Sequence, residues 1–88
     1  MVEKTVKIEN RAGIHARPAM ILVKTTLNFK SSIYLEKEGT RVNGKSIIGI
    51  LTLGAAYGTD LTIIAEGEDE EEAIMMLANI INSKFEEE

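Results

Sequence analysis

The sequence predicts one α+β domain over residues 1–88, in which three helices cover one face of a four-stranded antiparallel sheet. Two observations lead to this fold class. Strand-like segments that alternate apolar and polar side chains are interrupted by segments whose apolar residues recur at helical spacing. The order is β-α-β-β-α-β-α. Because amphipathic helices and a sheet with one wet face can bury their apolar sides against each other, a two-layer domain satisfies both patterns.

The first two elements are a strand over residues 2–9 and a helix over residues 16–27. In the strand, Val6 and Ile8 share one face because successive side chains point to opposite faces. Pro18 favours the first turn of a helix, where its missing N–H costs nothing. The stripe of the helix that we expect to face the sheet consists of Ala19, Leu22, Val23 and Thr26.

A second strand over residues 32–37 and a short third strand over residues 40–43 follow, joined by a turn at Glu38–Gly39. Ser46 then precedes a short apolar run that ends at Gly54. Serine is a favoured N-cap residue, so the run is interpreted as a short helix.

The last two elements are a strand over residues 59–66 and a helix over residues 70–84. Leu61 and its alternate neighbours point inward in the strand. Asp69, with Glu72 three residues later, resembles a capping box at the start of the helix. The apolar stripe expected to be buried consists of Ala73, Ile74, Leu77, Ile80 and Ile81.

Composition and charge argue against several classes of function. The chain has no cysteine and a single histidine, which disfavours disulfides and metal sites. No apolar run approaches the roughly 20 residues needed to span a bilayer, and the start lacks a signal-peptide pattern, so we expect a soluble cytoplasmic protein. The net charge is −4, with nine basic and four acidic side chains in residues 1–45 but one basic and ten acidic ones in residues 46–88. This acidic excess disfavours a nucleic-acid partner.

The run Gly13–Ala19 contains the only histidine and the only proline of the chain. His15 is expected at the mouth of the helix, where N–H groups and the positive end of the dipole receive anions. Arg17 supplies a guanidinium suited to phosphate oxygens. A purely structural histidine is the alternative. No serine lies in a nucleophile elbow, which leaves His15 itself as a nucleophile that accepts a phosphoryl group.

Ser46 is the second candidate site. Its simplest role is an N-cap worth about 1 kcal/mol. A phosphate on its hydroxyl would also be stabilised at a helix start. Three apolar residues on the short helix, Ile47, Ile48 and Leu51, cannot all be buried. An exposed apolar patch usually marks a partner site, so we expect one here.

Three segments resemble the HPr family, the histidine-containing phosphocarriers of the bacterial phosphoenolpyruvate-dependent sugar phosphotransferase system. They are Gly13–Ala19, Asn43–Gly49 leading to Leu53–Gly54, and Ile63–Gly67. The resemblance covers essentially the whole chain and implies an open-faced β-sandwich. It also implies that His15 takes phosphate on Nδ1 from phosphorylated enzyme I and passes it to enzyme IIA domains of sugar permeases.

The resemblance further assigns roles to individual residues. Arg17 and the amide of Ala16 would stabilise the phosphate, and Ser46 would be modified by an HPr kinase/phosphorylase. The Ser46-phosphorylated form would bind a catabolite-control transcription regulator. The partner interface would comprise Met20, Lys24, Ile47, Ile48 and Leu51. No metal or cofactor is implied, and a monomer is expected for a shuttle that docks to successive partners.

Two alternatives stay open at this point. One is a carrier of the nitrogen-related phosphotransferase branch, and the other is a regulatory binding module that acts mainly through the Ser46 surface. A family paralogue with glutamine at the active position is disfavoured by His15. The sequence also departs from the common family pattern at Gly44, which we expect to loosen the start of the short helix, and at Tyr57, which has no assigned role.

Overall fold

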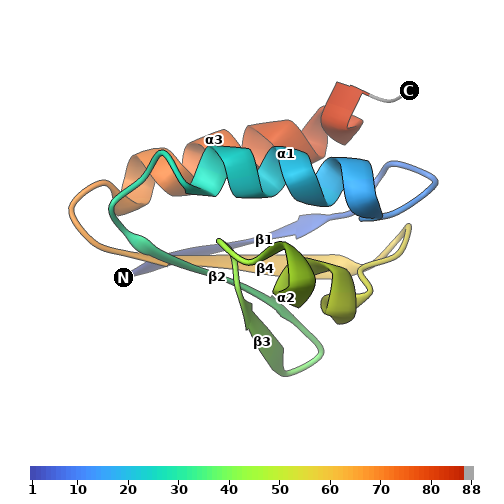
Figure 1. The fold of residues 1–88 in the computed structure, drawn as a ribbon, viewed down its shortest axis with the longest axis horizontal. Coiled ribbons are helices and arrows are strands. Elements are labelled where there is room, and N and C mark those ends of the chain that lie inside the picture. The colour runs from blue at the N-terminus through green and yellow to red at the C-terminus, as the bar shows by residue number, and fades with distance from the viewer. Residues whose placement is uncertain (87–88) are drawn as a thin grey trace.

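The computed structural model describes residues 1–86, and its elements follow the predicted order (Figure 1). They are β1 (Val2–Lys7), α1 (Ala16–Thr26), β2 (Ser32–Lys37), β3 (Thr40–Asn43), α2 (Ile47–Leu53), β4 (Asp60–Glu66), α3 (Glu70–Asn82) and a 3₁₀ turn, η1 (Lys84–Glu86). The predicted fold class is therefore confirmed. The helix and strand bounds differ from the predicted ones by at most two residues at each end.

The four strands form one antiparallel sheet in the order β1-β4-β2-β3. β4 lies between β1 and β2, and its inward side chains are the most enclosed. Leu61 is opposite Val6 on β1, and Ile63 is opposite Leu35 on β2. All four side chains are buried, as the alternation in the sequence predicts.

The helices α1 and α3 lie side by side across one face of this sheet, and α2 packs against β3 and α1 (Figure 1). The core between the layers contains the predicted helix residues Ala19 and Leu22 from α1 and Leu77 and Ile81 from α3. Because α1 is bound to the sheet along this stripe, its N-terminal end has a fixed place beside the loop that follows β1.

The end of the chain departs from the predicted helix. α3 ends at Asn82 rather than at residue 84. The three residues of η1 then have positive φ angles of 55–60°, the left-handed region. This turn places Phe85 in the core, where only 2% of its surface is exposed. Burial of one large aromatic side chain thus accounts for the early end of the helix.

The predicted capping box at α3 is wrong. Asp69 precedes the helix but makes no side-chain capping hydrogen bond. Its Oδ2 accepts from the backbone N–H of Lys30 at 2.9 Å, and its Oδ1 accepts from both the N–H and the hydroxyl of Ser31. The carboxylate that reaches back is that of Glu70, which accepts from the N–H of Gly67 at 3.0 Å. Asp69 therefore joins the start of α3 to the loop before β2.

These hydrogen bonds predict an acid-sensitive contribution of Asp69 to stability. The Ser31 hydroxyl and then the Lys30 amide favour the ionised form and lower the pKa of Asp69 from 3.8 to about 2. A depressed pKa means that the stabilisation is complete above about pH 4 and is lost as the pH falls towards 2. Asp69→Asn should therefore be less stable than wild type in urea at pH 7, and the difference should shrink between pH 4 and pH 2.

The matched control is Asp60→Asn, because Asp60 is exposed and makes only a surface ion pair with Lys7 at 3.2 Å. Such pairs contribute little, so this variant should stay close to wild type at every pH. A stability difference between Asp69→Asn and wild type that does not change with pH would contradict the role given to the Asp69 carboxylate.

Candidate functional site

His15 lies at the N-cap of α1, directly before the first helical residue. Its backbone is extended, and its carbonyl accepts the N–H of Ala19 at 3.0 Å, which is the first bond of the helix. The side chain is exposed and makes no capping hydrogen bond to the helix. The imidazole is therefore not used as a cap, and its ring is accessible at the mouth of α1.

The first turn of α1 provides a place for an anion. Ala16 and Arg17 precede Pro18, and the N–H groups of a first turn point out of the helix end because no earlier helical residue can accept them. No acidic residue lies in this turn. The positive end of the helix dipole and the exposed Arg17 side chain both attract negative charge to this place. The arrangement favours a doubly charged group beside His15.

The loop that carries His15 is pressed against the segment that follows α2. The N–H of Ile14 donates to the carbonyl of Ala55 at 2.8 Å, and the Ile14 side chain is buried. Gly13 has a φ of +72°, and a Cβ built on it would lie 2.9 Å from the Ala55 oxygen and 3.0 Å from the Cα of Ala56. Only glycine combines this conformation with so close an approach.

Asn10 lies beside the candidate site, although the sequence predicted only that it belongs to a loop. Its side chain is fully buried, and its Nδ2 donates to the carbonyl of Gly13 at 2.7 Å. The N–H of Gly13 in turn donates to the Asn10 carbonyl at 3.0 Å, and the N–H of His15 donates to the Gly13 carbonyl at 3.1 Å. An Asn followed by Gly three residues later is a recognisable turn signal, which could have drawn attention to this pair.

Ser46 is the N-cap of α2, as predicted. Its Oγ accepts from the N–H of Gly49 at 3.1 Å, and its carbonyl accepts from the N–H of Ile50 at 3.0 Å. Gly54 ends the helix in a left-handed conformation with φ of 66°. The side chain of Ser46 is half-buried, at the end of α2 that adjoins β3.

The expected loosening at Gly44 is wrong, because this glycine tightens the approach to α2. Its N–H donates to the Ile33 carbonyl at 2.7 Å, and a Cβ on it would lie 2.9 Å from the Ile33 side chain. Its carbonyl accepts the hydroxyl of Thr26 at 2.8 Å, and Lys45 Nζ donates to the Phe29 carbonyl at 2.8 Å. The segment before Ser46 is thus fastened to the end of α1 and the loop after it.

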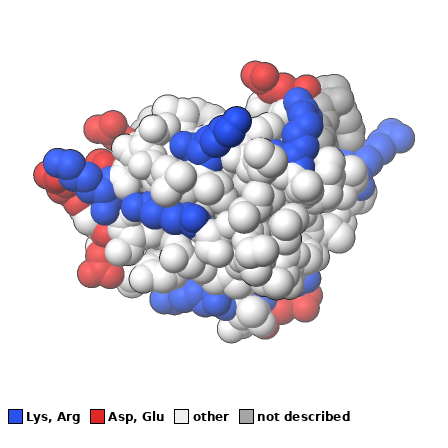
Figure 2. All heavy atoms as spheres, in the orientation of Figure 1, with Lys and Arg blue, Asp and Glu red and all other residues white. Residues whose placement is uncertain are grey.

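The predicted partner residues lie on the neighbouring helices α1 and α2. Ile48 is 68% exposed and Met20 47% exposed, and Leu51 is also exposed, whereas Ile47 is partly buried against the core. Lys24 is exposed on α1. Both helices face the viewer in Figure 1, and the same view in Figure 2 shows a central area without acidic atoms, with basic side chains around it. We call Met20, Ile48 and Leu51 the apolar patch.

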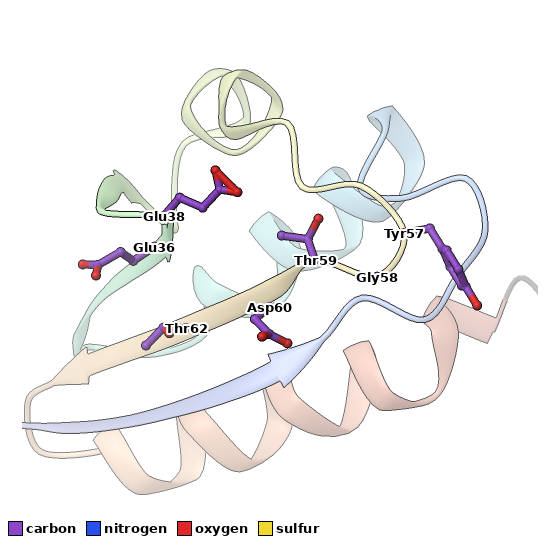
Figure 3. Close-up of a pocket in the computed structure, with 7 residues that line it drawn as sticks. All are labelled: Glu36, Glu38, Tyr57, Gly58, Thr59, Asp60 and Thr62. Atoms are coloured by element: carbon purple, nitrogen blue, oxygen red, sulfur yellow. The ribbon is translucent and has the colours of Figure 1, made fainter.

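A cavity elsewhere on the molecule has the opposite character. It is lined by Glu36, Glu38 and Asp60, with Tyr57 on the side away from the two glutamates (Figure 3). Three carboxylates without a basic residue in the lining disfavour an anion, so this cavity is not a phosphate site. Tyr57, 64% exposed, thus borders this acidic cavity.

Within residues 1–86, no cluster of three or more histidine, cysteine or carboxylate side chains could hold a metal ion. The same residues include no helix long and apolar enough to cross a membrane.

Comparisons with known proteins agree on one family. The profile described as "PTS HPr component phosphorylation site" matches residues 2–83. The phosphocarrier protein HPr of Treponema pallidum is 44% identical over 88 residues, covering all of both chains. The crystal structure of HPr-C-His from Thermoanaerobacter tengcongensis has a TM-score of 0.96 and 50% identity, covering 100% of this chain and 99% of that one.

A third relative is described as a catabolite repression protein. Crh of Bacillus subtilis, a catabolite repression protein, was solved as an intertwined dimer with a swapped domain. It is 42% identical, with a TM-score of 0.77, and covers 96% of this chain and 97% of that one.

The close contact at Gly13 predicts an unusually costly substitution. Gly13→Ala meets both a left-handed φ and a clash with backbone atoms, so it should lower the free energy of unfolding by roughly 2–4 kcal/mol. Gly39→Ala is the matched control, because Gly39 has a φ of +84° but nothing within 4 Å of an added Cβ. It should cost about 1 kcal/mol. Equal losses for the two variants in urea denaturation would contradict the close approach at Ala55.

Proposed function

The chain belongs to the HPr family of phosphocarrier proteins, and from this premise we propose that it carries phosphoryl groups on His15. It takes them from phosphorylated enzyme I and passes them to the enzyme IIA domains of sugar permeases. The observation that carries the proposal is the accessible His15 ring at the N-cap of α1, beside a first turn that contains Arg17 and no acid. No cofactor is needed, because the imidazole is itself the nucleophile.

The transfer balances without any further reactant. The lone pair of an imidazole nitrogen, Nδ1 by analogy with the family, forms the new bond to phosphorus. The bond between phosphorus and the donor atom breaks, and its electron pair leaves with the donor. In the second transfer, a nucleophile of the enzyme IIA domain attacks phosphorus, and the pair of the N–P bond returns to the ring. The protein is thus an intermediate in a relay and not an enzyme with its own substrate.

The first turn of α1 stabilises the phosphorylated state. The added group carries about two negative charges, which the amides of Ala16 and Arg17 and the helix dipole favour. The Arg17 guanidinium can contact the phosphate oxygens as well. An exposed site surrounded by water keeps this stabilisation moderate, and a moderate hold allows the group to move on.

The partners dock on the surface formed by α1 and α2. The apolar patch, together with Ile47 and Lys24, lies on α1, whose N-cap is His15, and on the neighbouring α2, and partner docking would bury it. The basic side chains seen around it in Figure 2 suit acidic partner surfaces. We place this relay in the cytoplasm and propose a monomer, because each docking event needs the same face to be free.

A second function rests on Ser46. Its half-buried Oγ sits at the N-terminus of α2, where phosphate from an HPr kinase/phosphorylase would meet a favourable dipole. The new dianion would stand at the edge of the apolar patch. It would repel the acidic partners of the relay and offer a contact to a catabolite-control transcription regulator that carries arginine residues. Ser46 would then switch the same surface between transport and regulation.

Two other functions remain as alternatives. The nitrogen-related phosphotransferase branch would use His15 in the same chemistry with different partners. A regulatory module would act through the Ser46 surface alone, and the 42% identity to Crh is the observation that favours it. The chemistry at His15 separates this module from both carriers, because only a carrier loses its function when the ring is removed.

We predict that enzyme I and phosphoenolpyruvate add one acid-labile, alkali-stable phosphate to the wild-type protein, located on His15 by mass spectrometry. His15→Ala should take up none, because no other imidazole is present. Label retained by His15→Ala would place the acceptor elsewhere.

Arg17→Ala should fold normally and accept phosphate about tenfold more slowly, since one cation is lost from the phosphate site. An unchanged rate would remove Arg17 from the mechanism.

A separate prediction concerns Ser46. Ser46→Asp keeps an oxygen that can cap α2, so the fold should stay intact, while affinity for enzyme I measured by calorimetry should fall at least about fivefold. Ser46→Ala is the control. It removes the bond to the Gly49 N–H and should cost about 1 kcal/mol of stability without weakening docking. Unchanged affinity in Ser46→Asp would refute the regulatory role of this charge.

A further inference from the structure

We propose that Asn10 is a positioning residue for the phosphoryl transfer, which acts on His15 through the peptide group of Gly13. This inference rests on the proposed carrier function and adds a residue to its site. Asn10 does not touch the phosphate or the imidazole in this proposal. It fixes the backbone from which the ring projects.

The contacts form a short chain of hydrogen bonds that leads to His15. Asn10 Nδ2 donates to the Gly13 carbonyl at 2.7 Å, and the same oxygen receives the N–H of His15 at 3.1 Å. The Gly13 carbonyl therefore has two donors that hold the plane of the Gly13–Ile14 peptide. The N–H at the other end of this plane, that of Ile14, is held by Ala55 at 2.8 Å. The Gly13–Ile14 peptide, which lies one peptide before the one that joins Ile14 to His15, is thus restrained at both its oxygen and its nitrogen.

Burial explains why Asn10 matters to orientation and not to docking. Its side chain has no exposed surface, so no partner protein can contact it. Burying an amide costs free energy unless it is hydrogen-bonded, and this amide places its donor on the turn that precedes the nucleophile.

The orientation of the ring should respond to the loss of this donor. Rotation of the Gly13–Ile14 peptide would release the His15 N–H from the Gly13 carbonyl, and this would change the direction in which the His15 side chain leaves the backbone. A nucleophile that is misplaced by about 1 Å can lose up to about 100-fold in rate. We therefore expect the rate of phosphoryl transfer, but not partner affinity, to depend on Asn10.

The test compares Asn10→Ala, which removes the donor, with Asn10→Asp, which keeps the shape but offers only acceptor oxygens to the Gly13 carbonyl. Phosphorylation is measured with enzyme I and phosphoenolpyruvate, and separately with phosphoramidate. In the latter reaction, the P–N bond of the reagent breaks, ammonia leaves and the N–P bond to His15 forms. We expect both rates to fall tenfold to 100-fold in the two variants. The KM that enzyme I shows for each variant as phosphoryl acceptor should be unchanged.

The matched control is Ser31→Ala. Ser31 is also a buried polar residue, 1% exposed, but it lies beyond the C-terminal end of α1 and bonds to Asp69. This variant should lose stability and retain the wild-type rates. Wild-type rates in folded Asn10 variants, or an equal slowing in Ser31→Ala, would overturn the proposal.

Two further outcomes separate the possible failures. If the wild-type protein takes up no phosphate from either donor, the proposed function fails and the role of Asn10 falls with it. If neither Asn10 variant folds, hydrogen exchange of the wild-type protein decides. The Asn10 side-chain amide hydrogens should be protected both before and after phosphorylation, and exchange at the rate of an exposed amide would overturn the proposal.

Discussion

The hydrogen bond from the Ile14 amide to the Ala55 carbonyl fixes where His15 stands relative to α2. The two segments can approach this closely because Gly13 has no Cβ, and because it adopts a left-handed conformation that reverses the chain. Two further bonds, from Ile8 to Thr59 and from Gly58 to Ile8, continue the contact along the end of β1. His15, the proposed nucleophile, and α2, part of the proposed docking surface, are therefore held in one arrangement, although they lie far apart in the chain.

His15 lies at the surface, whereas the elements that carry it are anchored to the core. α1 is held to the sheet by a buried stripe, and its far end is bound to the segment before Ser46 through Thr26 and Gly44. Both candidate phosphorylation sites thus lie at helix N-termini whose positions are set by the core. A carrier needs this combination, because a phosphate must be reachable by two partners in turn while the amides that stabilise it stay in place.

Periodicity and capping residues were sufficient to predict the order of elements and most of their ends. Ser46 caps α2 and Gly54 closes it as expected, since both effects act within one turn of the chain. Predictions failed where a distant partner competes for a local group. Asp69 bonds to Lys30 and Ser31 instead of capping α3, and Phe85 ends the last helix by entering the core. The motif around His15 predicts the nucleophile that we propose, but the buried donor of Asn10 and the packing of Gly44 on Ile33 depend on tertiary contacts.

The proposed carrier function requires that the first turn of α1 hold a phosphoryl group on His15. Amide chemical shifts of the isotopically labelled protein, recorded before and after stoichiometric phosphorylation, test it most directly. We expect the largest downfield shifts at the N–H groups of Ala16 and Arg17, with the shifts of α3 unchanged. Shifts that spare the first turn of α1, or that centre on another element, would contradict it.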